Sequence, residues 1–351
     1  MTHHKWLLYG AYGYTGRMIT GEALKRGHRP VLAGRSASAL QEFAKNFALD
    51  TLVFDLDHPN LVNIVRGFNL VFNAAGPFSK TSEPLVRACL EASVNYVDIT
   101  GEVAVFEKNF SYDAAAKKQG IVILSGVGFD VVPTDCAAKQ VCDRVPQATD
   151  LEIAFAISTG GSTGTLSTAL EAAPQGILER RAGQIVPISH FSDNKRVAFM
   201  DRSRTVMPIT WGDLATAYRT TGVPNISTYV AVSPAVAAGT RLFGKFVFSL
   251  LKNSLVRRLA QWLIKLLIKN PNPTTSWNAK SYVWARARNN EGRQAEVQIE
   301  LPCGPYPFTA VAGVASVERI FRDRPTGATT PALAFGTDFL SSLPGTKILN
   351  T

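Results

Sequence analysis

The sequence predicts an α/β protein, in which a doubly wound parallel sheet is joined to a second α+β domain built on a mixed or antiparallel sheet. Two observations predict the first part. A glycine-rich turn follows an apolar run at the start of the chain, and five further apolar runs alternate with helical patterns. The length predicts the second part, because 351 residues are enough for two domains with separate cores.

The strands of the first domain are expected at short apolar runs. Trp6–Tyr9 has the length and apolar continuity of a strand buried on both faces, as in a parallel sheet. Further strands are expected at Pro30–Ala33, Asp50–Asp55, Leu70–Asn73, Asn95–Ile99 and Ile121–Ser125. Helices are expected from Tyr14 and at Ala37–Asn46, Pro59–Val65, Glu83–Ala92, Val103–Gln119 and Thr134–Arg144. The ligand crevice then lies at the C-terminal ends of the strands.

Three glycines at a spacing of three follow the first strand. Gly10 lets the chain turn sharply, Gly13 lets the backbone approach a pyrophosphate, and Gly16 lets the helix lie close to the strand. The helix that follows begins near Tyr14 and directs its unpaired N–H groups toward the phosphates. A turn and helix without a ligand is the alternative, so the pattern needs support from the next strand.

That support comes from Arg35 and Ser36, which follow the second strand some twenty residues after the last glycine. An acidic residue at this place would accept a hydrogen bond from the ribose 2′-OH and favour NAD. A guanidinium and a hydroxyl instead suit a 2′-phosphate. The sequence therefore predicts NADP(H) as the cofactor, with a merely solvated Arg35 as the alternative.

Three carboxylates follow the ends of predicted strands, namely Asp98, Glu102 and Asp130. Such residues also cap helices or hold turns, so each has a structural alternative. We name Asp130, Glu102 and Thr100 as catalytic candidates, and the proton comes from Asp130, Glu102 or a bound water. Hydride transfer is expected beside Pro77 and Thr100.

The loop Ala74–Phe78 is expected beside the nicotinamide half of the cofactor, because Gly76 and Pro77 allow close backbone approach. Phe78 is expected to contact the substrate. Further positions assigned to the cofactor site are Tyr12, Tyr14, Thr15, Asp55, Ala75 and Asp98.

The second domain is expected to begin with a strand at Asp150–Ser158, followed by a turn of small residues and a helix at Leu166–Gly183. In that turn, Ser162 and Thr163 are assigned to the substrate, although they could only cap the helix. Further strands are expected at Ile226–Val232, Ser281–Arg288 and Glu296–Leu301, and closing helices at Tyr306–Phe321 and Thr330–Leu340. The predicted domains are 1–148 with about 305–351 for NADP binding, and 149–304 for substrate binding and dimerisation.

Composition places the chain among globular proteins, with 46% hydrophobic and 18% charged residues. The four cysteines form no Cys-x-x-Cys pair, and the five histidines do not cluster with them. We therefore expect no metal site and no disulfide framework. Because the first strand begins at about residue 5, no room is expected for a signal peptide, which indicates a cytoplasmic protein.

The excess positive charge lies in one segment. Between Asp213 and Glu291 there are eleven basic residues and no acidic residue. Residues 241–269 combine basic residues with apolar clusters and predict two amphipathic helices with a break near Asn253. The apolar runs are too short to span a bilayer, but an apolar face rimmed by cations is typical of a helix in an anionic membrane interface. Packing of this segment on its own domain or in a dimer interface is the alternative. A homodimer is expected as the assembly, and nucleic-acid binding is not expected.

Several motifs together resemble the saccharopine dehydrogenase-like oxidoreductases, and most of all their trans-acting enoyl reductase group. These are GAYGYTGR (10–17), LAGRS (32–36), NAAGPF (73–78), YVDITGE (96–102), GFDVVPTD (128–135) and STGTLS (162–167). The resemblance implies a Rossmann domain, a second domain on a mixed sheet, a nicotinamide cofactor and reduction of a C=C bond in a lipid-type intermediate. The chain departs from the family pattern at Tyr12, Val131, Thr134 and Thr163.

The sequence thus predicts an NADPH-dependent reductase of a hydrophobic or lipid-linked enoyl or carbonyl substrate. A saccharopine-type reductase of an imine or amino acid is a second interpretation. A non-catalytic protein that binds the cofactor and docks on membranes through 241–269 is the third. The leading interpretation places the protein in the cytoplasm, peripherally at a membrane.

Overall fold

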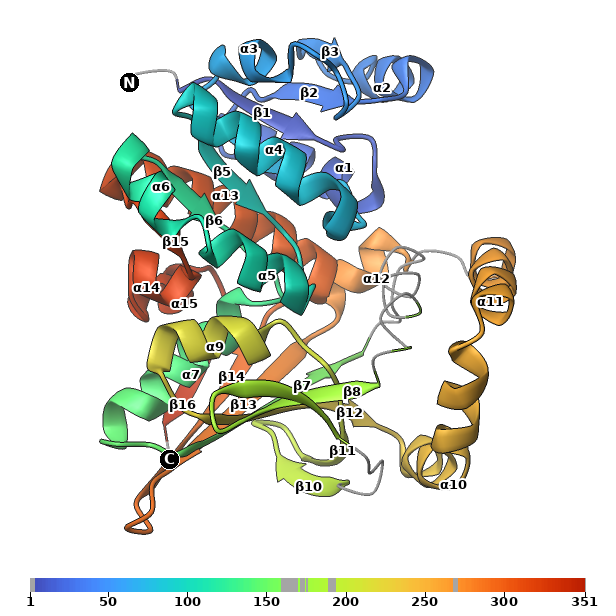
Figure 1. Cartoon of the computed structure of the whole chain (residues 1–351), viewed down its shortest axis with the longest axis vertical. Helices are drawn as coiled ribbons and strands as arrows, with labels where there is room; N and C mark the ends of the chain where they lie inside the picture. The colour runs from blue at the N-terminus through green and yellow to red at the C-terminus, as the bar shows by residue number, and fades with distance from the viewer. Residues whose placement is uncertain are drawn as a thin grey trace. The chain divides into compact units, whose positions relative to one another are not determined.

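The computed structural model describes residues 4–158, 170, 174, 176–188, 194–267 and 271–350. Its helices and strands form two compact units, whose elements are labelled in Figure 1. The first unit comprises Met1–Val132 and Tyr306–Phe339, and the second comprises Pro133–Pro305 and Leu340–Thr351.

A seven-stranded parallel sheet forms the centre of the first unit, which confirms the predicted doubly wound fold. In spatial order its strands are β15 (Gly327–Thr329), β6 (Val122–Leu124), β5 (Asn95–Asp98), β4 (Leu70–Asn73), β1 (Trp6–Tyr9), β2 (Val31–Gly34) and β3 (Thr51–Val53). Every residue of β1, β2 and β4 is buried, as their continuous apolar runs require. The strand order reverses between β1 and β4, where Tyr9 lies in register with Asn73, so the ligand crevice is expected at this point.

Helices connect these strands and bury apolar side chains against the sheet. They are α1 (Tyr14–Lys25), α2 (Ala37–Ala44), α3 (Leu61–Arg66), α4 (Phe78–Ala92), α5 (Val103–Phe110), α6 (Asp113–Gln119), α13 (Pro305–Asp323) and α14 (Pro331–Phe335), with α15 (Asp338–Ser342) at the unit boundary. One core cluster joins Leu7 and Val71 of the sheet to Val65, Leu85 and Ala116 of the helices. Burial of such side chains is the main source of stability in a domain of this kind.

Three details of the first unit differ from the prediction. The expected helix Val103–Gln119 is two helices, and the Ser111 hydroxyl donates to the Lys108 carbonyl at 2.6 Å where the first one ends. Helix α4 begins at Phe78, earlier than expected. The segment Thr330–Leu340 is broken at Gly336, which has a φ of +76°.

The second unit is built on a mixed sheet, as predicted. Its main path is β10 (Lys195–Ala198), β11 (Ser203–Pro208), β12 (Asn225–Val232), β7 (Asp150–Ile157), β13 (Ser281–Arg288), β14 (Gln294–Leu301) and β16 (Lys347–Asn350). Strands β7 and β12 pair in parallel, and the other neighbours on this path pair antiparallel. The helices of this unit are α7 (Val132–Arg144), α9 (Asp213–Thr221), α10 (Pro234–Leu251), α11 (Ser254–Leu267) and α12 (Pro273–Asn278).

The expected helix Leu166–Gly183 is wrong in its last part. Residues 177–188 form a β-hairpin of β8 (Ile177–Arg181) and β9 (Gln184–Ile188). The two turn residues, Ala182 and Gly183, have φ values of +45° and +79°. This is the left-handed geometry that joins antiparallel strands through two residues, and it is incompatible with a continuing helix.

The ends of the units also differ from the predicted domain bounds. Residues 133–148 and 340–351 lie in the second unit, although we expected them in the NADP-binding domain. Strand pairing explains the second case, because β16 completes the edge of the mixed sheet beside β14. Arg144 of α7 donates to the Glu296 carbonyl at 2.9 Å, which links α7 to the same sheet. The functional division into an NADP-binding and a substrate domain stays a prediction.

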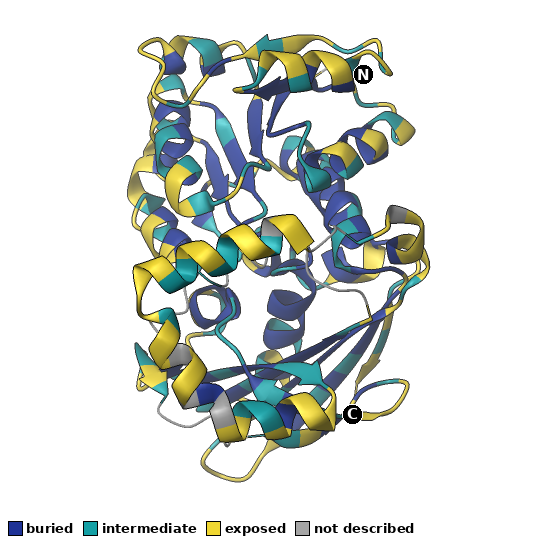
Figure 2. Cartoon of the chain, turned by 90° about the vertical axis from the view of Figure 1, so that its right-hand side faces the viewer, coloured by how far each residue is buried: buried dark blue, intermediate teal, exposed yellow. Residues whose placement is uncertain are grey.

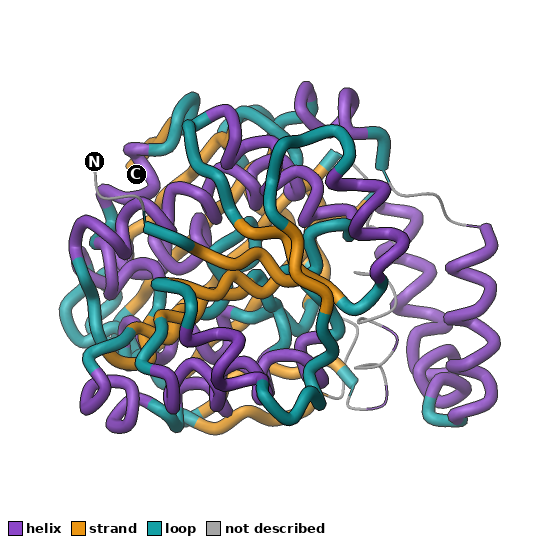
Figure 3. Tube along the Cα trace, turned by 90° about the horizontal axis from the view of Figure 1, so that it is seen from above, coloured by secondary structure: helices purple, strands orange, loops and turns teal. Residues whose placement is uncertain are grey.

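The basic segment forms two helices, as predicted. Helix α10 ends at Leu251 and α11 begins at Ser254, and Figure 3 shows the short turn between them. Arg257 donates to the carbonyls of Leu251 and Lys252 at 2.7 and 2.8 Å, so its guanidinium satisfies the C-terminal end of α10. In the described part of the chain, no helix is both long and apolar enough to cross a membrane.

Candidate cofactor and active site

The glycine turn is fixed to the end of the neighbouring strand. The backbone N–H groups of Gly10 and Ala11 both donate to the Ala33 carbonyl, at 2.9 and 3.2 Å. The N–H of Gly13 donates back to the Gly10 carbonyl at 3.0 Å and closes the turn. Gly10 has a φ of +83°, a left-handed backbone conformation that residues other than glycine rarely adopt.

Close backbone approach explains two of the three glycines. A Cβ added at Gly16 would clash with the Gly10 carbonyl oxygen, so the helix lies directly against the turn. A Cβ at Gly10 would lie only 2.9 Å from the N and Cβ atoms of Ala75. The turn after β1 therefore packs against the loop after β4, as a crevice at the reversal of strand order requires.

The first turn of α1 is suited to an anion. Its N-cap is Gly13, which has no side chain to cap the free N–H groups, and the first turn carries no acidic residue. The helix N-terminus therefore presents N–H donors and a partial positive charge to a pyrophosphate. The predicted residues Tyr14 and Thr15 begin this helix, and the Tyr14 ring packs edge-on against Tyr306 at 5.0 Å.

Tyr12 supports the end of β2. Its ring lies where a Cβ of Gly34 would be, and its hydroxyl accepts a hydrogen bond from the Ser36 N–H at 3.3 Å. Arg17 donates from Nε to the Tyr12 carbonyl at 2.8 Å, which holds this part of the turn. The large residue at this position thus joins the phosphate turn to the segment predicted to bind the 2′-phosphate.

Arg35 and Ser36 stand at the end of β2, as predicted. The Ser36 hydroxyl caps α2 by accepting from the Ala39 N–H at 3.4 Å. Arg35 is exposed, and its side chain makes no hydrogen bond or ion pair with the described residues. A guanidinium in this position can bind a phosphate without first breaking an internal contact.

Asp55 lies near the same end of the sheet, in the exposed loop after β3. It accepts a hydrogen bond from the Leu56 N–H at 2.8 Å. Burial, followed by the negative charge of Asp55, raises the pKa of Tyr9 to about 12. Asp55 is thus close enough to β1 to act on it electrostatically, and its role in cofactor binding stays a prediction.

The loop after β4 is held by polar side chains beneath it. The Asn73 carbonyl oxygen Oδ1 accepts from the Ala75 N–H at 3.0 Å, and the Thr81 hydroxyl donates to the Ala75 carbonyl at 2.6 Å. Asn73 also donates from Nδ2 to Thr81 at 3.1 Å. These contacts fix the backbone of Ala75, which precedes the predicted nicotinamide residues Gly76 and Pro77.

Asp98 is the centre of a buried hydrogen-bond network. Its carboxylate accepts from the hydroxyls of Tyr96 and Ser125 at 2.9 and 3.1 Å, and from the N–H groups of Thr100 and Gly126, both at 3.1 Å. The side chain is inaccessible to solvent, and this burial raises its pKa to about 6 despite the four donors. Direct contact with the cofactor stays a prediction for Asp98.

Sequence reasoning missed most members of this network. Tyr96 accepts from Asn73 Nδ2 at 3.2 Å, and Asn109 donates to Ser82 and Ser125 at 2.9 and 2.8 Å. The one available signal was a polar residue at the end of each buried strand. Their helix-borne partners Ser82 and Asn109 carry no local signal, since only the fold brings them to the strand ends.

Glu102 is engaged at the start of α4. Its two oxygens accept from the N–H groups of Phe78 and Ser79, at 2.7 and 2.9 Å. Its own N–H donates to the hydroxyl of Thr100 at 3.1 Å, and Thr100 is fully buried. The structure thus gives Glu102 a capping function, while the catalytic functions of both residues stay predictions.

Asp130 joins the same group of residues. A Cβ added at Gly101 would overlap the Asp130 carboxylate, so this side chain lies directly against the segment between Thr100 and Glu102. Asp130 is only partly buried, unlike Asp98. The structure therefore brings together Thr100, Glu102, Asp130 and the helix start at Phe78. The predicted substrate residues Ser162 and Thr163 lie outside the described residues.

A family comparison agrees with this geometry. Residues 6–124 match the family model of the saccharopine dehydrogenase NADP binding domain. The first unit contains a saccharopine dehydrogenase-type NADP-binding domain. The match confirms the resemblance inferred from the motifs, and it confirms NADP(H) as the cofactor. The Gly10–Gly16 turn fits the pyrophosphate of that ligand and the Arg35–Ser36 strand end fits its 2′-phosphate. NADPH would supply a hydride when bound.

Curated relatives of this saccharopine dehydrogenase-type domain match over less than half of the chain. A lipid droplet localized protein of Caenorhabditis elegans is 33% identical over 150 residues, which are 38% of this chain and 35% of the relative. A human saccharopine dehydrogenase-like oxidoreductase is 28% identical over 150 residues, which are 37% of this chain and 35% of the relative. A trans-acting enoyl reductase of Mycobacterium ulcerans is 29% identical over 189 residues, which are 48% of this chain and 44% of the relative.

Among the solved structures that resemble this chain over its whole length is a saccharopine dehydrogenase. It is the saccharopine dehydrogenase (L-Glu forming) of Saccharomyces cerevisiae, with a TM-score of 0.65, 11% identity and coverage of 99% of this chain and 100% of that one. At this identity the likeness concerns the fold. It therefore supports the predicted fold class, a Rossmann-type domain joined to a second domain on a mixed sheet.

Proposed function

We propose that this chain is an NADPH-dependent oxidoreductase that reduces an enoyl or carbonyl group of a hydrophobic or lipid-linked substrate. The observation that carries the proposal is the group of Thr100, Glu102 and Asp130 at the strand ends beside an NADP-binding turn. Redox enzymes of this type place their substrate at such an edge. Reduction adds a hydride to one atom of the double bond and a proton to the other.

Among these residues, we propose Asp130 as the group that supplies the proton. Both carboxylate oxygens of Glu102 already accept hydrogen bonds from backbone N–H groups at the start of α4. The Asp98 side chain is inaccessible to solvent, and its carboxylate already accepts hydrogen bonds from four donors. Asp130 is only partly buried as a residue, although its Oδ1 atom is inaccessible to solvent. Its carboxylate lies against Gly101, and we propose that it faces a ligand at this edge.

The hydrophobic substrate class has two supports. One relative is named a trans-acting enoyl reductase and another a lipid droplet localized protein. The second support is the row of exposed apolar side chains on α10 and α11. On the same grounds we propose a cytoplasmic location, peripheral at a membrane, which cell fractionation before and after a high-salt wash can test.

The decisive experiment compares two substrate classes with purified protein. NADPH oxidation is followed with medium- and long-chain enoyl thioesters and, separately, with keto acid and amine pairs. Turnover with the thioesters and not with the pairs is the expected result. The reverse result would replace this function by a saccharopine-type reductase of an imine or amino acid, the second interpretation of the sequence. NADPH binding without turnover on either class would support a non-catalytic protein.

A variant pair tests the proton donor. Asp130→Asn is expected to lower kcat about 100-fold or more, which is the usual contribution of a general acid, with little change in NADPH affinity. Glu291→Gln, at an exposed hairpin turn, removes one carboxylate elsewhere and should leave kcat unchanged. Unchanged kcat in Asp130→Asn would exclude this residue and favour a bound water.

A further inference from the structure

Helices α10 and α11 carry a large set of exposed apolar side chains. On α11 they recur at helical spacing, so they form one face, and their exposed fractions reach 69% at Leu255, 58% at Trp262 and 71% at Leu267. Figure 2 shows both helices mostly as exposed or intermediate residues. The exposed apolar residues are Val236, Leu242, Phe246, Val247, Leu250, Leu255, Leu259, Trp262, Leu263, Leu266 and Leu267. An exposed apolar face of this size on one helix is unusual on a free protein surface.

Positive charge accompanies this apolar face. Arg241, Lys252 and Arg258 are exposed, and none of the three forms an ion pair within the described part of the chain. No acidic residue occurs between Asp213 and Glu291, so nothing in this segment neutralises them. Helices that combine exposed apolar side chains with uncompensated cations match the chemistry of anionic phospholipids, whose headgroups lie directly above their acyl chains.

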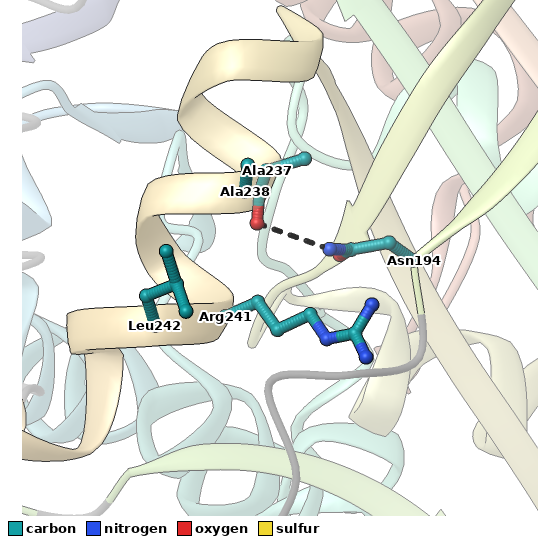
Figure 4. A pocket seen from close by; sticks show the side chains of 5 residues that line it. All are labelled: Asn194, Ala237, Ala238, Arg241 and Leu242. Atoms are coloured by element: carbon teal, nitrogen blue, oxygen red, sulfur yellow. Dashed lines mark hydrogen bonds between the residues drawn. The ribbon is translucent and has the colours of Figure 1, made fainter.

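An open pocket of about 450 Å³ lies beside α10 and combines both features. It is lined by Asn194, Ala237, Ala238, Arg241 and Leu242. Figure 4 shows the Arg241 side chain extending from the helix toward the segment that carries Asn194, whose Nδ2 donates to the Ala237 carbonyl at 3.3 Å. Leu242, with 74% of its surface exposed, is the next residue. A cation beside an exposed leucine is a suitable pair for a phosphate headgroup and its acyl chain.

We propose that α10 and α11 dock this protein on an anionic membrane surface. In this arrangement the helices lie in the interface and do not span it, because neither is, over its described residues, long and apolar enough to cross. The charge complementarity favours lipid over a second copy of the chain, since two copies would bring these uncompensated cations together. The proposal is independent of the catalytic function, which uses residues of the first unit.

Flotation with vesicles tests the proposal directly. The full-length protein is expected to bind vesicles of phosphatidylcholine mixed with phosphatidylglycerol at low salt, and to bind pure phosphatidylcholine weakly. High salt should weaken the binding. Trp262 gives a second readout, because its fluorescence should shift to shorter wavelength on the anionic vesicles. In Trp262→Phe the shift is expected to fall while flotation persists.

Paired variants separate charge from apolar contact. Lys252→Gln/Arg258→Gln is expected to weaken binding about 30-fold, on the scale of roughly 1 kcal/mol for each basic residue near an anionic surface. Lys118→Gln/Arg293→Gln, two exposed cations elsewhere, should leave it unchanged. Leu259→Gln/Leu266→Gln should also weaken binding, whereas Leu333→Gln/Leu349→Gln, two other exposed leucines, should not.

The alternative occupant gives a different pattern. If a second copy covers this face, light scattering will show a dimer that becomes a monomer in Leu259→Gln/Leu266→Gln, and wild-type protein will not float with any vesicle. That result overturns the proposal. Circular dichroism and NADPH binding confirm that each variant is folded, so that loss of flotation cannot come from unfolding.

Discussion

The carboxylate of Glu102 accepts a hydrogen bond from the backbone N–H of Phe78 at 2.7 Å. This contact joins the segment after β5 to the first turn of α4, and so connects two strand ends of the parallel sheet. The first N–H groups of a helix have no partner within the helix, and a carboxylate there satisfies them and interacts favourably with the helix dipole. A residue with the position of a catalytic acid therefore has a structural task.

Replacing Glu102 is expected to reduce stability. Glu102→Ala should lower the free energy of unfolding by about 1–2 kcal/mol, the usual cost of losing a helix cap. Glu91→Ala, at an exposed position of the same helix, should change it by less than about 0.5 kcal/mol. Urea denaturation measures both. Equal stability of the two variants would show that the Glu102 contacts contribute nothing, and a large fall in kcat for Glu102→Gln at unchanged stability would favour catalysis.

The buried carboxyl of Asp98 predicts a defined pH dependence. Burial raises its pKa from 3.8 to about 6, so between about pH 4 and 6 the folded state binds more protons than the unfolded state. Stability from this group is therefore present at low pH and is lost as the pH rises, by up to about 3 kcal/mol. The difference in unfolding free energy between wild type and Asp98→Asn should change accordingly from pH 4 to 7. A difference that stays constant with pH would contradict the raised pKa.

Arg35 predicts the preference between the two nicotinamide cofactors. If Arg35 binds the 2′-phosphate as predicted, Arg35→Ala removes a charge-assisted contact and should weaken NADPH binding about 10- to 100-fold. NADH lacks this phosphate, so its affinity should change little. Lys45→Ala, an exposed cation at the end of α2, serves as the control for a general loss of positive charge. Calorimetry with both cofactors measures the effect, and parallel losses for NADPH and NADH would argue against a 2′-phosphate contact.

Two glycines of α1 are expected to respond in opposite ways to the same substitution. Gly16→Ala places a methyl group against the Gly10 carbonyl and should lower the free energy of unfolding by about 1–3 kcal/mol. The same variant should also bind NADPH more weakly. At Gly21 an added Cβ meets no atom within 4 Å, so Gly21→Ala should stabilise the helix by up to about 1 kcal/mol. Thermal unfolding with and without NADPH separates the two effects. A stable Gly16→Ala variant with normal affinity would refute the close approach.

Much of the first unit could be predicted because its signals are local. Continuous apolar runs predicted the buried strands β1, β2 and β4. The glycine turn predicted a dinucleotide cofactor, and Arg35 with Ser36 predicted that it is NADP(H). The break between α10 and α11 was also visible, because the apolar and basic faces change direction there. Each of these features depends on residues close together in the chain.

The remaining features depend on contacts between distant residues. The edge strand β15 is three residues long and has no hydrophobic pattern that would predict a strand. The composition around Ala182 favoured a helix, although the chain forms a hairpin there. Nothing in the sequence around Asn109 indicates that its side chain donates a hydrogen bond to Ser125. Such elements are fixed by pairing and burial, whose energy exists only in the folded chain.

The parallel sheet, the NADP-binding turn and the two basic amphipathic helices follow from local patterns of residues, since backbone sterics and hydrophobic periodicity act over short stretches of chain. The environment of each carboxylate at the strand ends follows instead from how the chain packs. Packing buries Asp98 among four donors, engages Glu102 at the start of α4 and places Asp130 against Gly101. The physical reason is that the protonation and hydrogen bonding of a carboxyl group depend on the atoms around it, and these come from several elements.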